Sequence, residues 1–378
     1  MANVALRGDR TERSVVTDWW QSVDRVSLAA MLLLAGFGIV IVLAATPAIA
    51  LRRGAAPFSL FQRHMVTLGL ALAIALLLSF APQRIVRRVS LLIATSAGLG
   101  LVAVLFVGPE INGARRWLRF GGFSLQPSEL MKPAFVVLAG FLLSEARRSF
   151  GWLLPIASGL FLLVVALILF EPDVGQAALL TAVWFGMLVL AGVSMRVLAG
   201  IGAVGLVGFA FVATTFGHVN RRLMAFLFTG KEGQQAARAR QSFIEGGLYG
   251  RGPGEGSIKN VLSDAHTDYI FAVVAEEYGG LACLVLLALF ALIALRWLGR
   301  AITSPDTFVR VALGGLALLL AGQALIHMGV NVGLLPAKGM TLPLISAGGS
   351  STVGTGLLFG FALALGRRVE VVRTRRGR

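Results

Sequence analysis

The sequence predicts an all-α, polytopic membrane protein with about ten transmembrane helices, and three observations support this. Of the 378 residues, 57% are hydrophobic and only 14% are charged, which is too few charges to cover a soluble domain of this length. Apolar runs of about 20 residues, each long enough to cross a bilayer as a helix, recur from end to end. Membrane β-barrels show shorter segments of alternating hydrophobicity instead.

The apolar runs predict one transmembrane bundle over residues 27–366. A basic tail precedes it at residues 1–26, and a second basic tail follows it at residues 367–378. No cleavable signal pattern is expected, because about 26 polar residues precede the first apolar run. The expected helices, in order, cover residues 27–46, 64–80, 89–107, 128–148, 152–170, 176–192, 197–215, 268–296, 308–331 and 352–366.

Polar or helix-breaking residues separate these runs. The first loop carries Arg52 and Arg53, and Ser128 is suited to capping the fourth helix. The turn at residues 171–175 separates the fifth and sixth helices, because its Pro and Gly favour a turn. The longest polar segment, residues 216–267, becomes a large loop between the seventh and eighth helices.

The net charge of +16 is informative about topology. Short Arg-rich loops favour the cytoplasmic side of a membrane. Counting helices from the N-terminus places both tails on one face with most such loops, so both termini are predicted to be cytoplasmic. The Arg residues are scattered over many loops, which argues against nucleic-acid binding. The inner loops are 82–88, 145–150, the loop with Arg196, and 296–310.

The loops that carry candidate catalytic or binding residues then share the outer face. This indicates that the protein's chemistry takes place at the extracytoplasmic surface of the membrane. Arg52, Arg53 and the arginines at 115, 116 and 119 run against the positive-inside assignment but do not reverse it. The single Cys283 excludes a disulfide framework. The outer loops are 108–127, 171–175, 216–267 and 332–351.

An acidic cluster, rare in this chain, lies at the start of the eighth helix. Asp268 stands at the mouth of that apolar helix. Partial burial beside other carboxylates would raise its pKa and suit it to general-base catalysis. Favourable interaction with the helix dipole explains the position equally well, and composition does not separate the two readings. The ionisable residues of the cluster are Asp264, His266, Asp268, Glu276 and Glu277.

Three other outer segments carry candidate binding residues. Arg115 and Arg116 can clamp a phosphate or pyrophosphate through paired donors, with Trp117 at headgroup level; an interfacial aromatic with snorkelling arginines is the alternative. Glu129 and Lys132 are three residues apart at a helix start and can face each other. Such charges near a membrane interior are either functional or a structural ion pair.

The remaining outer segments give weaker signals. Asp173 can act as a helix cap and nothing more. The Gly-rich part of the 216–267 loop suits an anionic ligand, although a flexible connector explains it as well. In the last outer loop, Lys338 adds a cation and residues 348–351 offer backbone donors near a helix start, a pattern that binds phosphate or forms a re-entrant loop.

Six blocks carry a resemblance to a known family. Lying in order across nearly the whole chain, they resemble the SEDS family of bacteria (shape, elongation, division and sporulation). Three stretches, NGARRWLRF, MGVNVGLLPAKG and TLPLIS, are closer to its cell-division branch than to its elongation branch. Ala347 departs from the family, which usually has an aromatic residue there. The blocks are NGARRW, QPSELMK, EPDVGQA, GGLYGRGPGEG, DAHTDYIFAVVAEE and GLLPAKGMTLPLISAGGSS.

The resemblance implies an inverting peptidoglycan glycosyltransferase that polymerises lipid II, with undecaprenyl pyrophosphate as leaving group. It would act at the outer face of the bacterial cytoplasmic membrane, at the division septum. The resemblance makes Asp268 the essential acidic residue, and the expected chemistry gives it the role of general base. It names no metal ligand and leaves open a divalent cation such as Mg²⁺ or Mn²⁺. The expected substrate-binding residues are Trp117, Arg115, Arg116, Lys132, Glu129, Lys338, His266 and Ser350.

The implied partners are a cognate class B penicillin-binding protein, which is a transpeptidase, and other membrane proteins of the division complex. Two alternatives remain open from the sequence. One is a flippase that moves lipid II outward, and the other is a non-catalytic scaffold of the division machinery. Charges within the membrane zone lie mostly at the outer helix ends, which favours surface chemistry over a continuous polar path.

Overall fold

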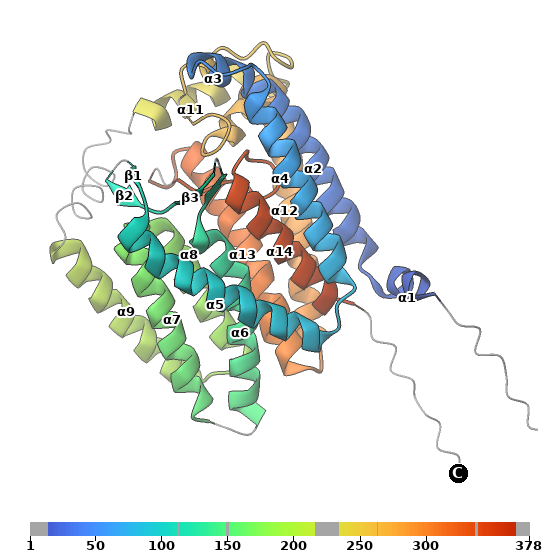
Figure 1. Cartoon of the computed structure of the whole chain (residues 1–378), viewed down its shortest axis with the longest axis vertical. Coiled ribbons are helices and arrows are strands. Elements are labelled where there is room, and N and C mark those ends of the chain that lie inside the picture. Colours follow the sequence, from blue (N-terminus) through green and yellow to red (C-terminus); the bar gives the residue numbers. More distant parts are fainter. Residues whose placement is uncertain are drawn as a thin grey trace, which may run out of the picture.

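The computed structural model describes residues 14–111, 113–121, 123–148, 151–215, 234–262, 264–336 and 339–367. Ten helices of 17–34 residues within these ranges form one bundle (Figure 1). The predicted all-α bundle of about ten helices is therefore confirmed. The helices are α2 (Arg25–Ala45), α4 (Ser59–Ser79), α5 (Gln83–Val107), α6 (Pro127–Arg148), α7 (Leu153–Phe170), α8 (Val174–Leu190), α9 (Met195–Thr215), α12 (Ile270–Thr303), α13 (Thr307–Asn331) and α14 (Gly349–Leu365).

Short elements occupy segments that the sequence left as tail or loop. Helix α1 (Val15–Ser22) lies within the expected N-terminal tail, and α3 (Pro47–Arg52) follows α2 directly. The large loop contains helix α11 (Gln234–Gly246) and a 3₁₀ turn, Ile258–Asn260. The loop after α5 forms two antiparallel hairpins. These pair β1 (Glu110–Ile111) with β2 (Ala114–Arg115), and β3 (Leu118–Phe120) with β4 (Phe123–Leu125).

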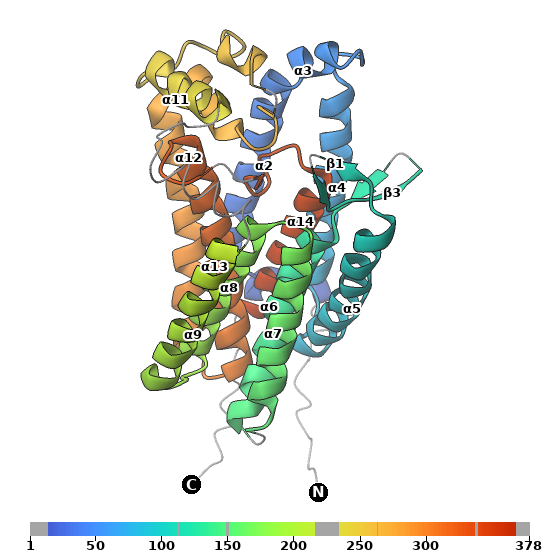
Figure 2. The same cartoon turned by 90° about the vertical axis from the view of Figure 1, so that its left-hand side faces the viewer.

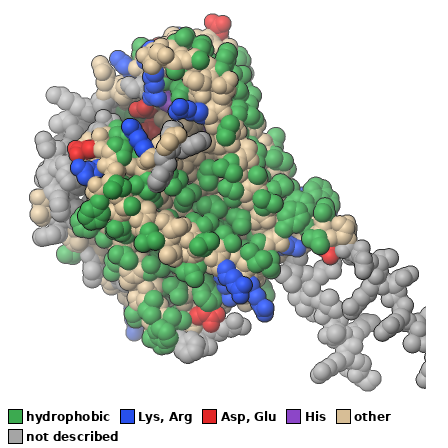
Figure 3. Space-filling view, in the orientation of Figure 1, with side chains coloured by type: hydrophobic (Ala, Val, Ile, Leu, Met, Phe, Trp, Pro, Cys, Tyr) green, Lys and Arg blue, Asp and Glu red, His purple; other side chains and the backbone are tan. Residues whose placement is uncertain are grey.

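The helices divide into a buried centre and an exposed ring. In α13, 67% of the most apolar window is buried, against 22% in α4 and in α7. Hydrophobic side chains cover much of the face that Figure 3 shows, as expected where helices face lipid rather than water. Small residues allow close packing at the centre, where the backbone of Ala312 leaves no room for a side chain on Gly140.

One end of the bundle is closed by a buried ion cluster. Asp24, 2% exposed, accepts a hydrogen bond from Arg296 Nε at 2.7 Å, and Arg300 Nη2 lies 3.1 Å from it. At the same end Arg367 Nε donates to Ser22 Oγ at 3.0 Å, which joins the chain's two described ends. Helices α3 and α11 lie at the opposite end (Figures 1 and 2). The Arg-rich end remains predicted to face the cytoplasm.

Helix α12 is broken near its outer end, and the large loop repairs the break. Gly279 has φ 79°, a left-handed value that glycine adopts at little cost. The break frees backbone groups, which must find partners. The loop supplies them: Arg251 N donates to Glu276 O at 2.9 Å, and Gly280 N donates to Gly247 O at 2.8 Å. The first turns of α12 and the loop therefore form one outer unit.

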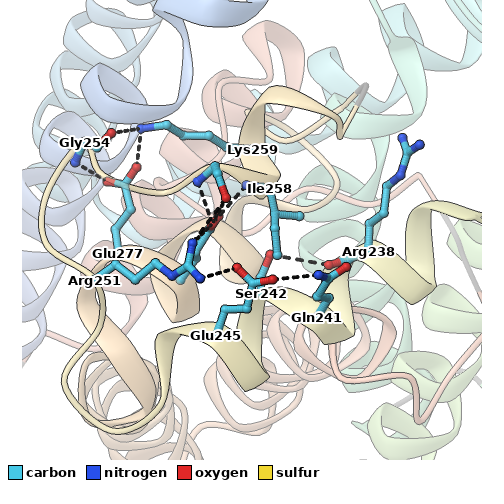
Figure 4. Close-up of polar contacts among 11 residues, drawn as sticks. Arg238, Gln241, Ser242, Glu245, Arg251, Gly254, Ile258, Lys259 and Glu277 are labelled. Carbon is cyan, nitrogen blue, oxygen red and sulfur yellow. Dashed lines mark hydrogen bonds and ion pairs between the residues drawn. The ribbon is translucent and has the colours of Figure 1, made fainter.

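Two buried carboxylates, those of Glu276 and Glu277, fix this outer unit from inside. Figure 4 shows Glu277 with its partners Lys259 and Gly254. Glu276 Oε1 accepts hydrogen bonds from Ser257 N at 2.6 Å and Ile258 N at 2.9 Å. Glu277 Oε1 pairs with Lys259 Nζ at 2.5 Å. This geometry gives Glu277 a structural role, and Glu276 shares that role.

Adding a methyl group at Gly250 is expected to destabilise this outer unit. Gly250 has φ 81°, and a Cβ there would overlap the carbonyl oxygen of Glu277. We expect Gly250→Ala to cost about 3 kcal/mol from left-handed strain plus overpacking, seen as a lower unfolding temperature of the purified protein. Gly200→Ala in α9 is the control, since nothing lies within 4 Å of its Cβ position. Equal unfolding temperatures for the two variants would contradict this account.

Candidate functional site

Asp268 lies in a tight turn immediately before α12. The carbonyl of Asp264 accepts hydrogen bonds from Asp268 N at 3.0 Å and Tyr269 N at 3.1 Å, which closes the turn. Asn331, fully buried at the end of α13, then holds the turn in place. Its Nδ2 donates to the Asp268 carbonyl at 3.0 Å, and its Oδ1 accepts from Ala272 N at 3.1 Å. The backbone of Asp268 is thus fixed to two helices.

The last outer loop docks against the same turn. Ser346 Oγ donates to the Thr267 carbonyl at 2.7 Å, and Ala347 N donates to the His266 carbonyl at 2.9 Å. A Cβ on Gly339 would lie 3.3 Å from Asp268 Oδ2, so the loop backbone passes beside the carboxylate. Two outer segments that are far apart in the sequence therefore form the walls around Asp268.

The acidic turn between α7 and α8 is held by Arg116. Its Nε donates to the Glu171 carbonyl at 2.9 Å, and its Nη2 donates to the Pro172 carbonyl at 2.6 Å. Its Nη1 lies 3.5 Å from Asp173 Oδ2. Asp173 also caps α8 by accepting from Gln176 N at 3.2 Å, as the sequence suggested. Arg116 is therefore the counter-ion of the acidic turn.

The electrostatics of the site favour a proton-accepting Asp268. Its side chain is half-buried, and burial together with the carboxylates of Asp264 and Asp173 raises the pKa of Asp268 to about 7, with Arg116 acting in the opposite direction. A carboxyl group with a pKa near the working pH can both take up and release a proton.

Glu171 is a second perturbed carboxyl group. It is fully buried, and both of its side-chain oxygens are without hydrogen-bond partners in the described structure. Burial, reinforced by Asp173, raises the pKa of Glu171 to about 8. A pKa of about 8 leaves the Glu171 carboxyl mostly protonated, and therefore mostly neutral, at pH 7.

A buried polar group connects the acidic turn to the centre of the bundle. Lys132 is 2% exposed, and its Nζ lies 3.0 Å from Glu129 Oε2 and 3.0 Å from Gln323 Oε1. Gln176 Nε2 donates to Glu129, and Gln323 Nε2 donates to the Thr341 carbonyl at 3.1 Å. The ion-pair reading of Glu129 and Lys132 matches this geometry, and the pair links α6, α8, α13 and the last outer loop.

A sequence comparison identifies the family. The profile of the cell cycle protein family FtsW/RodA/SpoVE matches residues 24–370. The chain belongs to this family. The chain is 40% identical over 364 residues to a probable peptidoglycan glycosyltransferase FtsW of Caulobacter vibrioides, covering 95% of this chain and 93% of that one. It is 37% identical to the probable peptidoglycan glycosyltransferase FtsW of Nitrosococcus halophilus, covering 92% of each.

Solved structures agree with the FtsW/RodA/SpoVE assignment. One match is a chain of a peptidoglycan synthase complex, solved to show the structural coordination of polymerization and crosslinking. Its TM-score is 0.74 at 30% identity, and the match covers 92% of this chain and 98% of that one. The rod shape determining protein RodA of Thermus thermophilus matches with a TM-score of 0.67 and 30% identity, covering 92% and 97%. This family member is a multi-pass membrane protein, and the predicted SEDS membership is confirmed.

The other expected site residues differ in burial and in their contacts in this family member. Arg115 lies on β2, exposed, with its Nη2 3.8 Å from Glu110 Oε2. Trp117 is half-buried between the two hairpins. His266 is buried beside Asp268, and its Nδ1 is without a partner in the described structure. Lys338 lies outside the described residues.

Ser350 connects two outer segments. Its Oγ accepts a hydrogen bond from Gln126 N at 2.9 Å and donates to the Ser124 carbonyl at 3.2 Å. It thereby fixes β4 to the start of α14. Its expected role in binding substrate remains a prediction, as do those of the other binding residues.

The described residues do not fit a divalent cation bound by protein side chains alone. No group of three or more His, Cys, Asp or Glu side chains suited to a metal occurs within the ranges that the structure describes. Glu171 and Asp173 have oxygens to offer, which hard cations prefer. However, the Arg116 guanidinium already supplies positive charge at Asp173.

Sequence reasoning missed Asn331 and Glu171 as functional candidates. Asn331 ends a mostly apolar helix, and a carboxamide in that place was the available signal. Glu171 was recognised only as part of a turn. Its burial depends on how α7, α8 and the hairpins pack together, which no local pattern encodes.

Replacing Glu171 with glutamine is expected to stabilise the fold and flatten its pH dependence. The pKa of Glu171 is raised from 4.5, its ordinary value, to about 8 in the folded state. The folded protein therefore loses stability as the pH rises from about 4.5 towards about 8. Glu171→Gln removes that loss, which we put at about 3 kcal/mol at pH 7. Unfolding temperatures of both proteins measured from pH 5 to 9 should converge at the acid end and diverge above it. Parallel curves would contradict the assignment.

Proposed function

We propose that the chain is a peptidoglycan glycosyltransferase that polymerises lipid II into glycan strands at the outer face of the cytoplasmic membrane, during septal cell-wall synthesis. The names of its FtsW relatives support the activity, and the family description, a cell cycle protein, supports a role in division. The observation that carries the catalytic assignment is Asp268, a half-buried carboxyl group whose pKa is raised to about 7 and whose backbone is fixed by Asn331.

In the proposed reaction Asp268 is the general base. The carboxylate takes the proton of the 4-hydroxyl of one lipid-linked disaccharide, and the freed oxygen attacks the anomeric carbon of the other. The bond from that carbon to the undecaprenyl pyrophosphate breaks, and the leaving pyrophosphate keeps the electron pair. A single displacement of this kind inverts the anomeric centre. A base in this position contributes about 10²–10⁴-fold to the rate.

Cations in the outer loops suit the leaving group, because positive charge stabilises a departing pyrophosphate. Arg116 is engaged with the acidic turn, so its first role is to lower the electrostatic cost of the acids near Asp268. Trp117, Arg115 and Lys338 remain the proposed contacts to substrate. Lys132 would act from within the ion pair that it forms with Glu129.

We also propose that the chain works with a class B penicillin-binding protein and other division-complex membrane proteins. The similarity to a chain of a peptidoglycan synthase complex supports a transpeptidase partner. Coupling to a transpeptidase is chemically sensible, because newly made glycan strands need crosslinking.

The deciding experiment supplies labelled lipid II to the purified protein with its transpeptidase partner. Polymeric glycan resolved by gel is the expected result. A parallel assay in liposomes follows movement of a labelled lipid II across the bilayer. Transport without polymer would replace the glycosyltransferase by a flippase, and absence of both activities would favour a scaffold.

A further inference from the structure

An apolar groove opens between α2 and α12 on the lipid-facing side of the bundle. Its volume is about 300 Å³, and its lining is almost entirely hydrophobic. Such a groove suits a hydrocarbon chain, because it offers no partner for polar groups. Its main lining residues are Leu32, Gly36, Phe37 and Val40 of α2, with Val274 and Tyr278 of α12.

Two local features create the groove. Gly36 has no side chain, and nothing lies within 4 Å of the position where its Cβ would be. Tyr278 is followed by the left-handed Gly279, so α12 changes direction along the groove wall. Val274 is the fifth residue of α12, whose first residue follows Asp268 by two positions. The groove wall at Val274 therefore belongs to the first turns of the helix that begins directly after the Asp268 turn.

Two arginines lie above the outer end of α2, on α3 and directly after it. Arg52 Nη2 donates to the Leu262 carbonyl at 3.3 Å, and Arg53 Nη2 lies 4.0 Å from Asp264 Oδ1. The Arg53 side chain is 53% exposed, so its guanidinium remains accessible. Both arginines contact residues of the loop segment that leads into Asp268. They are also among the arginines whose outer position runs against the positive-inside pattern.

We propose that the α2–α12 groove and the Arg52–Arg53 pair form one binding site for a polyprenyl pyrophosphate, the lipid end of one of the two substrates. The polyprenyl chain lies in the groove and the pyrophosphate is bound by the two guanidinium groups. The sugar attached to that pyrophosphate is then held beside the segment 262–268. This inference rests on the proposed function and names a subsite for its substrate.

The chemistry of the two features favours this occupant over a protein helix. Guanidinium groups bind phosphates through paired donors, and a polyprenyl pyrophosphate combines that anion with a long apolar chain. The arrangement of the site also matches the arrangement of this lipid in a membrane. The apolar groove lies within the membrane, and the two cations lie at the outer surface. A transmembrane helix of a partner would fill the groove without requiring the arginines.

Binding of radiolabelled undecaprenyl pyrophosphate to the full-length protein in nanodiscs tests the proposal. In the double variant Arg52→Ala/Arg53→Ala, the Kd is expected to rise at least about tenfold, from loss of charge-assisted hydrogen bonds. Gly36→Leu, which fills the groove, should raise the Kd by a similar factor. Its space is open, so the fold should tolerate the change.

Two matched controls separate the site from general effects. Gly69→Leu fills an equally open, lipid-facing position on α4, and Arg119→Ala removes an exposed outer arginine on β3. Both should leave the Kd unchanged. Inorganic pyrophosphate should compete with undecaprenyl pyrophosphate for the two arginines, both in the wild type and in Gly36→Leu.

Polymerisation kinetics supply the second readout. Both site variants should raise the KM for lipid II while keeping most of kcat at saturation. Unchanged Kd and KM would overturn the proposal. Loss of the co-purifying transpeptidase in Gly36→Leu, with lipid binding intact, would overturn it as well by making the groove a protein interface. Wild-type lipid binding without any polymerisation would refute the proposed function and leave this site standing.

Discussion

Asp268→Asn is expected to abolish polymerisation of lipid II while leaving the fold intact. Asparagine keeps the shape of the side chain and leaves the backbone bonds to Asn331 and Asp264 in place. It removes the proton acceptor, so we expect the rate to fall by about 10²–10⁴-fold. The loss is measured with labelled lipid II and the transpeptidase partner.

The unfolding temperature provides the control for Asp268→Asn. Because burial disfavours the charged carboxylate, the neutral amide should be tolerated without loss of stability. An inactive protein that also unfolds earlier would indicate a structural role for Asp268. Polymerisation at the wild-type rate would exclude it as the general base.

The same assignment predicts the pH profile of the wild-type enzyme. A general base works in its deprotonated form, and the pKa of Asp268 is raised to about 7. The polymerisation rate should therefore fall tenfold per pH unit below about 7 and level off above it. A rate that stays constant down to pH 5 would be incompatible with this pKa.

Lys132→Met is expected to produce the largest loss of stability in the bundle. Lys132 Nζ lies 3.0 Å from Glu129 Oε2, and both side chains are almost fully buried. Removing the cation leaves the Glu129 carboxylate without its counter-ion within the membrane zone, and breaking a buried pair costs about 3–5 kcal/mol. Unfolding temperature and folded yield in detergent both measure this loss.

Two further variants show whether the ion pair itself is responsible. The double variant Lys132→Met/Glu129→Gln removes both charges and should recover much of the stability. Arg115→Met breaks an exposed pair, with side chains 46% and 61% exposed, and should change stability by less than about 1 kcal/mol. A double variant as unstable as Lys132→Met would show that packing, rather than charge, dominates.

The sequence predicted the bundle well because membrane insertion imposes a strong local rule. Every backbone polar group in hydrocarbon needs an internal partner, so each run of about 20 apolar residues is expected to form a helix. The break in α12 was not predicted. Gly279 follows a helical pattern, and its left-handed conformation depends on hydrogen bonds from a loop some 30 residues earlier.

The candidate site also has a part that the sequence predicted and a part that it did not. Asp268 was visible as an acid in an acid-poor chain, and the resemblance to known motifs singled it out. Its neighbours in space were not all visible. Asn331, Ser346 and Gly339 reach Asp268 or its turn from 63 to 79 residues along the chain, through contacts that carry no periodic pattern.

By itself the sequence determined the helices, their order and the residue types available for chemistry, because hydrophobic length and charge act locally. Only the tertiary structure decided what each charged group does. Glu276 and Glu277 anchor a loop, Arg116 binds the carbonyls of the acidic turn, and Lys132 neutralises Glu129. These roles depend on which buried groups meet in a low-dielectric interior, where an unpaired charge is costly and its partner comes from a distant segment.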